Sequence, residues 1–309
     1  MGQNFTPTNQ ELECGKVIAE LKGTYRNEDL RLVSKHVKKT DGVESYFNGK
    51  AKTYDNYFGL LYFQVHNQIT WRHIEPYLPT DPNALILDAC GGTGRWSIRM
   101  ARKGCRVVLL DISEKMLETA EKRIRREGLQ NRIIIKREDI TKTSYPDETF
   151  DMILCELALL FFENPDILLK ELSRVLKRGG RLIISAPNRY VQSLVALPEK
   201  PNPRDMENAL DILLRKKYGT MPENTKVKIY TWTPDEFRKM LERNGFSVEK
   251  IVGKATTMPL RISKELFTKK GSSRSLYNKI LQFELALCEQ PDALALADDL
   301  QAIARKPLG

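Results

Sequence analysis

Paired cysteines are lacking in this chain of 309 residues, and histidine is scarce. No two of the five cysteines form a CxxC pair, and the three histidines have no tight spacing. An odd number of scattered thiols indicates an intracellular protein with reduced cysteines rather than a disulfide framework. So few histidines also predict that the protein has no structural zinc site.

A long hydrophobic run is lacking as well. The longest near-apolar stretch, residues 152–162, contains Cys155 and Glu156, whereas a helix needs about 20 apolar residues to cross a bilayer. The first residues show no charged start followed by an apolar run, as a secretory signal would. We therefore expect a cytoplasmic protein without a membrane span.

Charge is present in excess of one sign. The chain has 50 Lys and Arg against 40 Asp and Glu, a net charge of +10, and 41% of its residues are hydrophobic. Residues 99–137 hold much of the excess, with twelve Lys and Arg against five acids. A solvated helix face is the favoured interpretation and a nucleic-acid surface is the alternative. The composition as a whole is typical of a globular protein.

Apolar runs alternate with helical patterns from residue 84 onward. The expected strands are 84–89, 105–110, 133–136, 150–156, 181–186, 246–252 and 300–305. Such alternation predicts an α/β fold, a Rossmann-like, mostly parallel sheet of seven strands with helices on both faces. We expect a helix over 113–127 with Ser113 as its N-cap, and another that begins at Pro234 after a capping box of Thr233 and Glu236.

The regular pattern suggests four segments. We expect residues 1–70 to form an N-terminal helical or lid segment, and 71–187 to form the first part of the core. Residues 188–230, which follow the fifth strand, interrupt the pattern and are expected to be a lid insertion with one helix over 205–217. Residues 231–309 complete the core, with a loop over 254–275.

A glycine-rich turn follows the first expected strand. The strand ends near Asp88, and Gly91, Gly92 and Gly94 precede a helix. Glycines allow the backbone to approach a ligand, and a helix N-terminus offers free N–H groups. Asp111 ends the second strand, where a carboxylate can bind ribose hydroxyls. A dinucleotide site would require a third glycine or an alanine where Ser97 stands, and Asp88 suits the amino group of a methionine moiety better than a pyrophosphate.

The turn resembles the D-x-G-x-G-x-G loop of class I S-adenosylmethionine-dependent methyltransferases. Further segments resemble the same family: residues 139–140, 150–188 and 231–253. The resemblance covers about residues 45–309 and is strongest to the group that includes quinone-biosynthesis and small-molecule methyltransferases. One position departs from the pattern, since Cys90 stands where the first glycine usually lies.

The resemblance implies S-adenosylmethionine as cofactor. In that family Asp111 would bind the ribose, Asp139 would face the adenine amine, and Cys155 would line the cleft near the methyl group. A tyrosine, here Tyr54, would close over the cofactor, because aromatic faces attract a sulfonium cation. The full set of expected cofactor residues is Tyr54, Asp88, Gly91, Gly92, Gly94, Asp111, Ile112, Met116, Asp139, Ile140 and Cys155.

Methyl transfer needs a general base only where the acceptor must lose a proton. Glu156 ranks first among the candidate bases, followed by His66, with His73 a further candidate. The expected acceptor is a small molecule, contacted by aromatic residues of the variable segments, for which we choose Tyr57, Tyr190 and Trp232. An RNA methyltransferase and a non-catalytic partner protein of the same fold remain alternatives, although no nucleic-acid module is evident. We expect no metal ion at the site.

Overall fold

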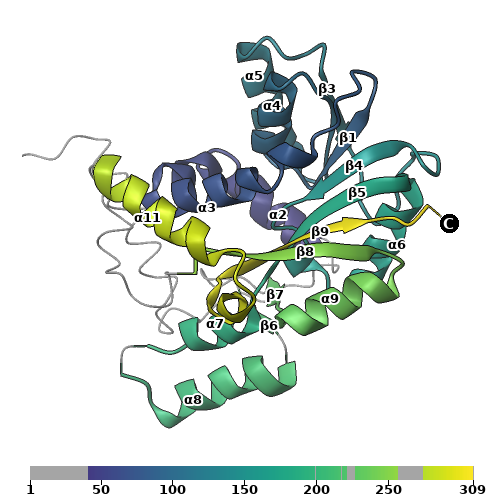
Figure 1. Ribbon diagram of the computed structural model, residues 1–309. Coiled ribbons are helices and arrows are strands. Elements are labelled where there is room, and N and C mark those ends of the chain that lie inside the picture. The colour runs from purple at the N-terminus through teal and green to yellow at the C-terminus, as the bar shows by residue number, and fades with distance from the viewer. Residues whose placement is uncertain (1–40, 199, 217, 221–226, 257–273, 309) are drawn as a thin grey trace, which may run out of the picture.

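The computed structural model describes residues 41–308 apart from 199, 217, 221–226 and 257–273 (Figure 1). The first forty residues of the predicted N-terminal segment, and most of the predicted loop over 254–275, therefore lie outside the described residues. Within the described ranges, no helix is both long and apolar enough to cross a membrane.

A seven-stranded sheet forms the centre of the molecule, in the order β3-β2-β1-β4-β5-β9-β8. All neighbours pair in parallel except β9, which is antiparallel to β5 and to β8. The prediction of a mostly parallel sheet of seven strands is confirmed. The strands are β1 (Leu85–Ala89), β2 (Arg106–Asp111), β3 (Ile133–Arg137), β4 (Phe150–Cys155), β5 (Leu176–Pro187), β8 (Ser247–Lys254) and β9 (Asp299–Arg305).

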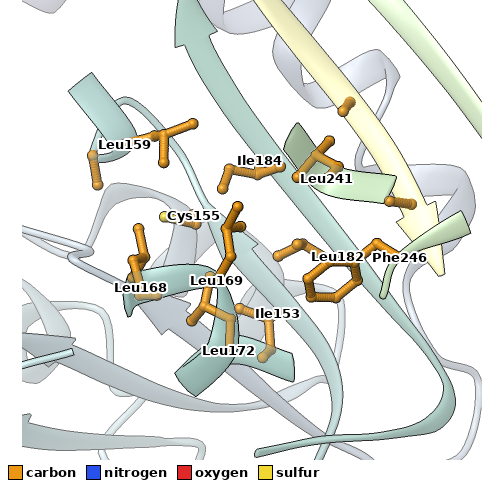
Figure 2. Packing of buried hydrophobic residues seen from close by; sticks show 14 of the residues in the cluster. Ile153, Cys155, Leu159, Leu168, Leu169, Leu172, Leu182, Ile184, Leu241 and Phe246 are labelled. Carbon is orange, nitrogen blue, oxygen red and sulfur yellow. The ribbon is translucent and has the colours of Figure 1, made fainter. Parts of the chain in front are cut away.

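Helices cover both faces of the sheet (Figure 1). On one face α6 (Pro165–Val175) and α9 (Pro234–Arg243) bury their leucines against β4 and β5, as Figure 2 shows. On the other face α4 (Arg95–Arg102) and α5 (Glu114–Arg126) enclose a second core. Both faces are apolar because the central strands are buried on both sides, which explains their continuous hydrophobic runs.

The predicted helix starts are confirmed by their caps. The Ser113 hydroxyl accepts a hydrogen bond from the Met116 N–H at the start of α5. Thr233 and Glu236 form the reciprocal capping box that begins α9. These side chains satisfy backbone N–H groups that a helix leaves unpaired at its first turn, which is why the local sequence alone locates both starts.

The described part of the segment before β1 is helical. It contains α2 (Asp41–Lys50), the 3-10 helix η1 (Tyr54–Gly59), α3 (Leu61–Arg72) and the short turn η2 (Glu75–Tyr77). The helix α3 ends at Arg72, before the proline of η2. The helix α11 (Arg274–Leu287) packs along α3 through a small separate apolar cluster.

The insertion after β5 is richer than the one helix predicted there. The predicted helix is present as α8 (Pro203–Leu210), continued by the π-helix η4 (Asp211–Lys216). The helix α7 (Arg189–Val195) and the two-stranded ladder of β6 (Tyr218–Thr220) and β7 (Lys228–Tyr230) were not predicted. Two further 3-10 turns are η3 (Leu159–Phe161) and η5 (Pro291–Leu296).

Candidate functional site

The glycines of the turn between β1 and α4 are required for two reasons, lack of space and backbone conformation. A Cβ on Gly91 would lie 2.3 Å from Leu109 Cδ1 and 2.7 Å from the Asp88 carboxyl group. Gly92 and Gly94 have φ values of 55° and 75°, in the left-handed region that side chains disfavour. The turn is therefore compact, with its backbone exposed to a ligand.

Cys90 adopts a left-handed conformation as well, with φ of 58°. This value explains why glycine is usual at the position, since a Cβ in the left-handed region crowds the following carbonyl. The thiol side chain is half-buried and lines the pocket described below. Cysteine at this position therefore makes the turn energetically less favourable than glycine would, while the backbone keeps the left-handed conformation.

The buried side chain of Asp88 stabilises this turn through hydrogen bonds. Its side chain is 1% exposed, and Oδ2 accepts hydrogen bonds from the Ser97 N–H at 2.9 Å and the Ser97 hydroxyl at 2.6 Å. Burial raises the pKa of Asp88 to about 6, although both hydrogen bonds from Ser97 act to lower it. Ser97, which excluded a dinucleotide fingerprint, is thus the residue that holds the acid in place.

Asp111 joins the end of β2 to the turn. Its Oδ2 accepts from the Gly92 N–H at 2.9 Å, and its Oδ1 accepts from the Ser113 N–H at 2.8 Å. Burial raises the pKa of this carboxyl group too. The acid that the sequence assigns to the ribose therefore lies beside the glycine turn, at the edge where the parallel strands end.

A pocket opens beside the turn, with about 490 Å³ of space, part of it open to solvent. Four parts of the chain line it: the turn itself, η1, the facing sides of α3 and α4, and the residues after β4. The lining residues are Tyr54, Phe58, Asn67, Asp88, Cys90, Gly91, Gly92, Thr93, Arg95, Trp96, Glu156 and Leu157. Four of the residues predicted for the cofactor, Tyr54, Asp88, Gly91 and Gly92, thus meet here together with the first candidate base, Glu156.

The segment before β1 is fastened over the turn by polar contacts. Asp55 accepts hydrogen bonds from the Thr93 hydroxyl at 2.9 Å and from Arg123 at 2.8 Å, and Arg123 also donates to the Thr93 carbonyl. Asn48 of α2 accepts from the Ser113 hydroxyl at 2.8 Å. We call residues 41–62 the cover, because they close the pocket on this side.

Aromatic rings connect the cover to the far side of the pocket. Tyr54 packs edge-on against Phe47 and Phe58, and Phe47 packs in the same way against Phe161 of η3. Arg95 stacks on the Phe58 ring and donates to the Asn67 side chain at 2.9 Å. Burial raises the pKa of Tyr54, so the phenol stays protonated at neutral pH.

Glu156 enters the pocket from a strained turn. Leu157 has φ of 52°, and its N–H donates to the Ser185 hydroxyl at 2.7 Å. The Glu156 side chain is 3% exposed, and one oxygen, Oε1, is ion-paired with Lys254, which is fully buried at the end of β8. Its other oxygen, Oε2, has no hydrogen-bond partner among the described residues.

The two histidine candidates have structural partners instead. His66 is buried, is not among the lining residues, and bonds through Nε2 to Asp299 Oδ2 at 3.0 Å. Burial lowers the pKa of His66 to about 3, and the charge of Lys254 adds to this effect. His73 bonds to the Ile69 carbonyl and to Glu289. Glu156 is therefore the candidate base that the pocket contains.

Several predicted residues lie beside the pocket or away from it. Met116 is buried in the first turn of α5, and Ile140 is buried three residues beyond the end of β3, while the exposed Asp139 accepts from Thr141. Asp111 and Ile112 lie at the end of β2. None of these five lines the pocket, so the expected adenine position lies outside it.

Cys155 and the expected substrate residues lie elsewhere in the structure. The Cys155 side chain points into the α6 core among Leu168 and Leu169 (Figure 2) rather than into the pocket. Trp232 is also in that core, and Tyr190 is 41% exposed on α7. The side chain of Tyr57 lies outside the described part of the structure.

The sequence did not identify three candidate site residues that the structure reveals: Asp55, Arg95 and Lys254. Arg95 follows the last glycine directly, so its position was the one available signal. Lys254 lies 98 residues from Glu156 in the chain, and no local pattern connects the two. Within the described ranges, no three His, Cys, Asp or Glu side chains gather as a metal site would require.

Comparison with known proteins identifies residues 87–184 as a methyltransferase domain. A ubiquinone/menaquinone biosynthesis C-methyltransferase of Hydrogenovibrio crunogenus is 33% identical over 163 residues, which is 52% of this chain and 63% of that protein. The demethylmenaquinone methyltransferase of Bacteroides fragilis is 31% identical over 54% of this chain and 69% of its own length. The chain thus spans somewhat less than two thirds of the first of these relatives.

Another relative matches over more of the chain at lower identity. The tRNA 5-carboxymethoxyuridine methyltransferase of Escherichia coli is 26% identical over 260 residues, 82% of this chain and 92% of that protein.

Among solved structures, a (4+2)-cyclase has a TM-score of 0.61 at 18% identity and covers 88% of this chain and 98% of its own. A magnesium protoporphyrin IX methyltransferase of Synechocystis with bound S-adenosylmethionine has a TM-score of 0.54 at 18% identity, over 89% of this chain and 100% of its own. At these identities the likeness supports the fold alone.

Proposed function

Because this chain belongs to the class I S-adenosylmethionine-dependent methyltransferases, we propose that it transfers a methyl group to a small organic acceptor. The observation that supports this best is the pocket itself. It joins the glycine turn, the aromatic cover and a buried carboxylate, Glu156, in one space. A concave pocket that combines apolar walls with a few polar groups is typical of a small-molecule site.

The residues at the pocket fit S-adenosylmethionine. The bare backbone of Gly91 to Gly94 and the buried carboxyl group of Asp88 suit its methionine part. Tyr54 offers a ring to a sulfonium cation, and Asp111 lies where ribose hydroxyls would be bound. We propose Ile112, Met116, Asp139 and Ile140, which follow the ends of β2 and β3 in the chain, for the adenine. Cys155 is not proposed, since its side chain faces the core.

When bound, S-adenosylmethionine supplies an electrophilic methyl group on a good leaving group. The chain then mainly has to align the acceptor and exclude water. Tyr54 and Phe58 exclude water from the cover side, and Arg95, stacked on Phe58, lines the same pocket. Glu156 is proposed to receive the proton that the acceptor loses.

The relatives favour an organic acceptor. One of them is named for ubiquinone/menaquinone biosynthesis, and another is named as a demethylmenaquinone methyltransferase. We propose that the insertion over residues 188–230 covers the acceptor side. It begins at Pro187, where β5 ends at the same edge of the sheet as the glycine turn.

RNA is the second candidate acceptor. The relative that spans 82% of this chain is named for a tRNA substrate, and residues 99–137 are strongly basic. Many of these cations, however, already have acidic partners, which reduces the charge available to phosphates. The pairs are Arg102–Glu127, Lys103–Glu75, Arg125–Glu121 and Arg137–Glu44.

One experiment separates the two candidates. The protein is incubated with methyl-labelled S-adenosylmethionine and, in separate reactions, with a cell metabolite extract and with total RNA. We expect label in the metabolite fraction. Label in RNA, together with RNA binding that falls steeply with salt, would instead support the second candidate. Absence of label from both would contradict the proposed function.

A further inference from the structure

A buried charge cluster lies directly behind the pocket. Lys254, at the end of β8, is fully buried and ion-paired with Glu156. Across the sheet Lys254 stands opposite Asp299 in the register of β8 and β9. Asp299 in turn bonds His66 of α3 at 3.0 Å. Four elements, the turn after β4, β8, β9 and α3, thus contribute one ionisable group each to the same buried cluster.

Several buried polar atoms in and near this cluster have no hydrogen-bond partner among the described residues. Glu156 Oε2, His66 Nδ1 and both side-chain polar atoms of Gln301 have no hydrogen-bond partner within the described ranges, although all three residues are nearly or fully buried. An unpaired buried polar atom is destabilising, so natural proteins retain it where it has a use. Glu156 is the member of this set that also lines the pocket. Its free oxygen is therefore positioned to meet a ligand.

The charges around Glu156 favour a particular kind of ligand. Lys254 touches it, and the guanidinium group of Arg95 lines the same pocket. One cation in contact with the accepting carboxylate, and a second cation in the same pocket, favour an acceptor that becomes anionic as it loses its proton, as a phenol or an enol does. They disfavour an amine, whose methylation leaves a cation.

We propose that Glu156 takes a proton from a phenolic or enolic hydroxyl group of the acceptor, and that Lys254 is the positioning residue that keeps Glu156 ionised and oriented. This inference rests on the proposed function. The hydroxyl proton passes to Glu156 Oε2, and the electron pair released forms the bond to the methyl carbon, from oxygen or from a conjugated ring carbon. The sulfur keeps the pair of the broken S–CH₃ bond, and S-adenosylhomocysteine leaves.

Other charged and titratable groups interact with Glu156 and belong in any account of its pH dependence. They come from β1, η1, α3, α4 and the end of β4: Asp88, Tyr54, His66, Arg95 and Cys155. None of them replaces Lys254, because Lys254 is the cation in direct contact with the carboxylate.

The first test asks whether Lys254 holds Glu156 ionised, and it needs no acceptor. Unfolding is measured from pH 5 to pH 8 for the parent, Lys254→Met and the double variant Lys254→Met with Glu156→Gln. In Lys254→Met a buried carboxylate without its cation should hold its proton, so the loss in stability should grow as the pH rises. The double variant, which removes both charges, should lose this trend and keep the fold. An equally steep trend in the double variant would assign the effect to Asp299, the other carboxylate beside Lys254, and would overturn the inference.

The second test measures transfer. Label from S-adenosylmethionine into the metabolite extract should fall about 100-fold or more in Glu156→Gln. The binding of S-adenosylmethionine and S-adenosylhomocysteine should change little. A selective loss of the cationic ligand would instead place Glu156 at the sulfonium and overturn the inference. Lys254→Met should move the acidic limb of the pH profile upward by about one pH unit or more, and Lys254→Arg should move it less. An unmoved limb would assign Lys254 a purely structural role.

The acceptor class is tested on the extract itself. Acetylation caps hydroxyl groups and amines, whereas reductive methylation caps amines alone. We expect the acetylated extract to lose its capacity to accept label and the reductively methylated extract to keep it. Loss in both would identify an amine and contradict the proposal. If the untreated extract accepts no label from the parent enzyme, the proposed function fails and this inference fails with it.

Discussion

Asp55 of the cover and Thr93 of the glycine turn share a hydrogen bond of 2.9 Å, which joins the segment before the sheet to the loop that shapes the pocket. Arg123 of α5 binds both partners, so three elements meet at this point. Because few polar contacts hold the cover on the glycine turn, a ligand that orders the turn can also order the cover. The ion pair is partly exposed, with 36% of the Asp55 side chain accessible, so each contact is individually weak.

We expect the cover to be ordered further by S-adenosylmethionine. Hydrogen exchange should slow across residues 41–62 when the cofactor binds, because closing the pocket protects these amides. Asp55→Ala should speed exchange over η1 and weaken cofactor binding by about 1 kcal/mol. Asn56→Ala, an exposed neighbour, is the matched control and should change neither. Unchanged exchange with the cofactor demonstrably bound would mean that the cover is a fixed packing element.

Asp111→Ala should weaken S-adenosylmethionine binding by about 1–3 kcal/mol. The change removes a charged acceptor from the expected ribose position and frees the Gly92 N–H that Asp111 holds. Calorimetry measures the effect, with NAD as a ligand that we expect not to bind to the parent. Parental affinity in the variant would show that the ribose lies elsewhere than the end of β2.

Much of this site could be predicted from the sequence because its signals are local. The glycine turn, the acids at the ends of β1 and β2, and both helix caps each depend on a few neighbouring residues. Cys155 was placed wrongly relative to the pocket, since strand alternation puts it on the same face as Ile153, toward α6. The next residue, Glu156, turns into the pocket instead.

Contacts between distant segments could not be predicted. A lysine near the end of an expected strand is usually solvated, and the burial of Lys254 depends on packing between β8, β9 and α3. The bond between Asp55 and Thr93 likewise joins residues 38 positions apart, one of them in an irregular segment. The helix α7 was missed because its start, Asn188, caps it through a side chain that also bonds the η5 region.

Cys90→Gly should stabilise the protein slightly. The left-handed φ of 58° costs a residue with a Cβ about 1–2 kcal/mol, whereas glycine adopts it freely and loses part of that gain through greater freedom in the unfolded chain. We expect a net gain of up to about 1 kcal/mol in denaturant unfolding. Cys90→Val is the contrasting variant, since a β-branched side chain should be destabilising there. Equal stability of the glycine and valine variants would contradict this account of the turn.

Asp88 should make the free energy of unfolding depend on pH in a predictable direction. Burial raises the pKa of Asp88 in the folded protein to about 6, above its ordinary value of 3.8. Below the lower value both states are protonated, so the buried carboxyl costs nothing. As the pH rises through this window the unfolded chain ionises first, and the folded protein loses up to about 3 kcal/mol of relative stability.

Asp88→Asn removes the titration but keeps an oxygen that can accept from Ser97. The free energy of unfolding of this variant, minus that of the parent, should therefore rise between about pH 4 and pH 6 and then level off. The opposite trend from His66, whose pKa burial lowers to about 3, is common to both proteins and cancels in the difference. Ser97→Ala is the matched contrast. It removes the 2.6 Å hydroxyl bond that favours the carboxylate, so the parent-type fall should extend to higher pH. A difference between Asp88→Asn and the parent that stays constant across this range would contradict the burial argument for Asp88.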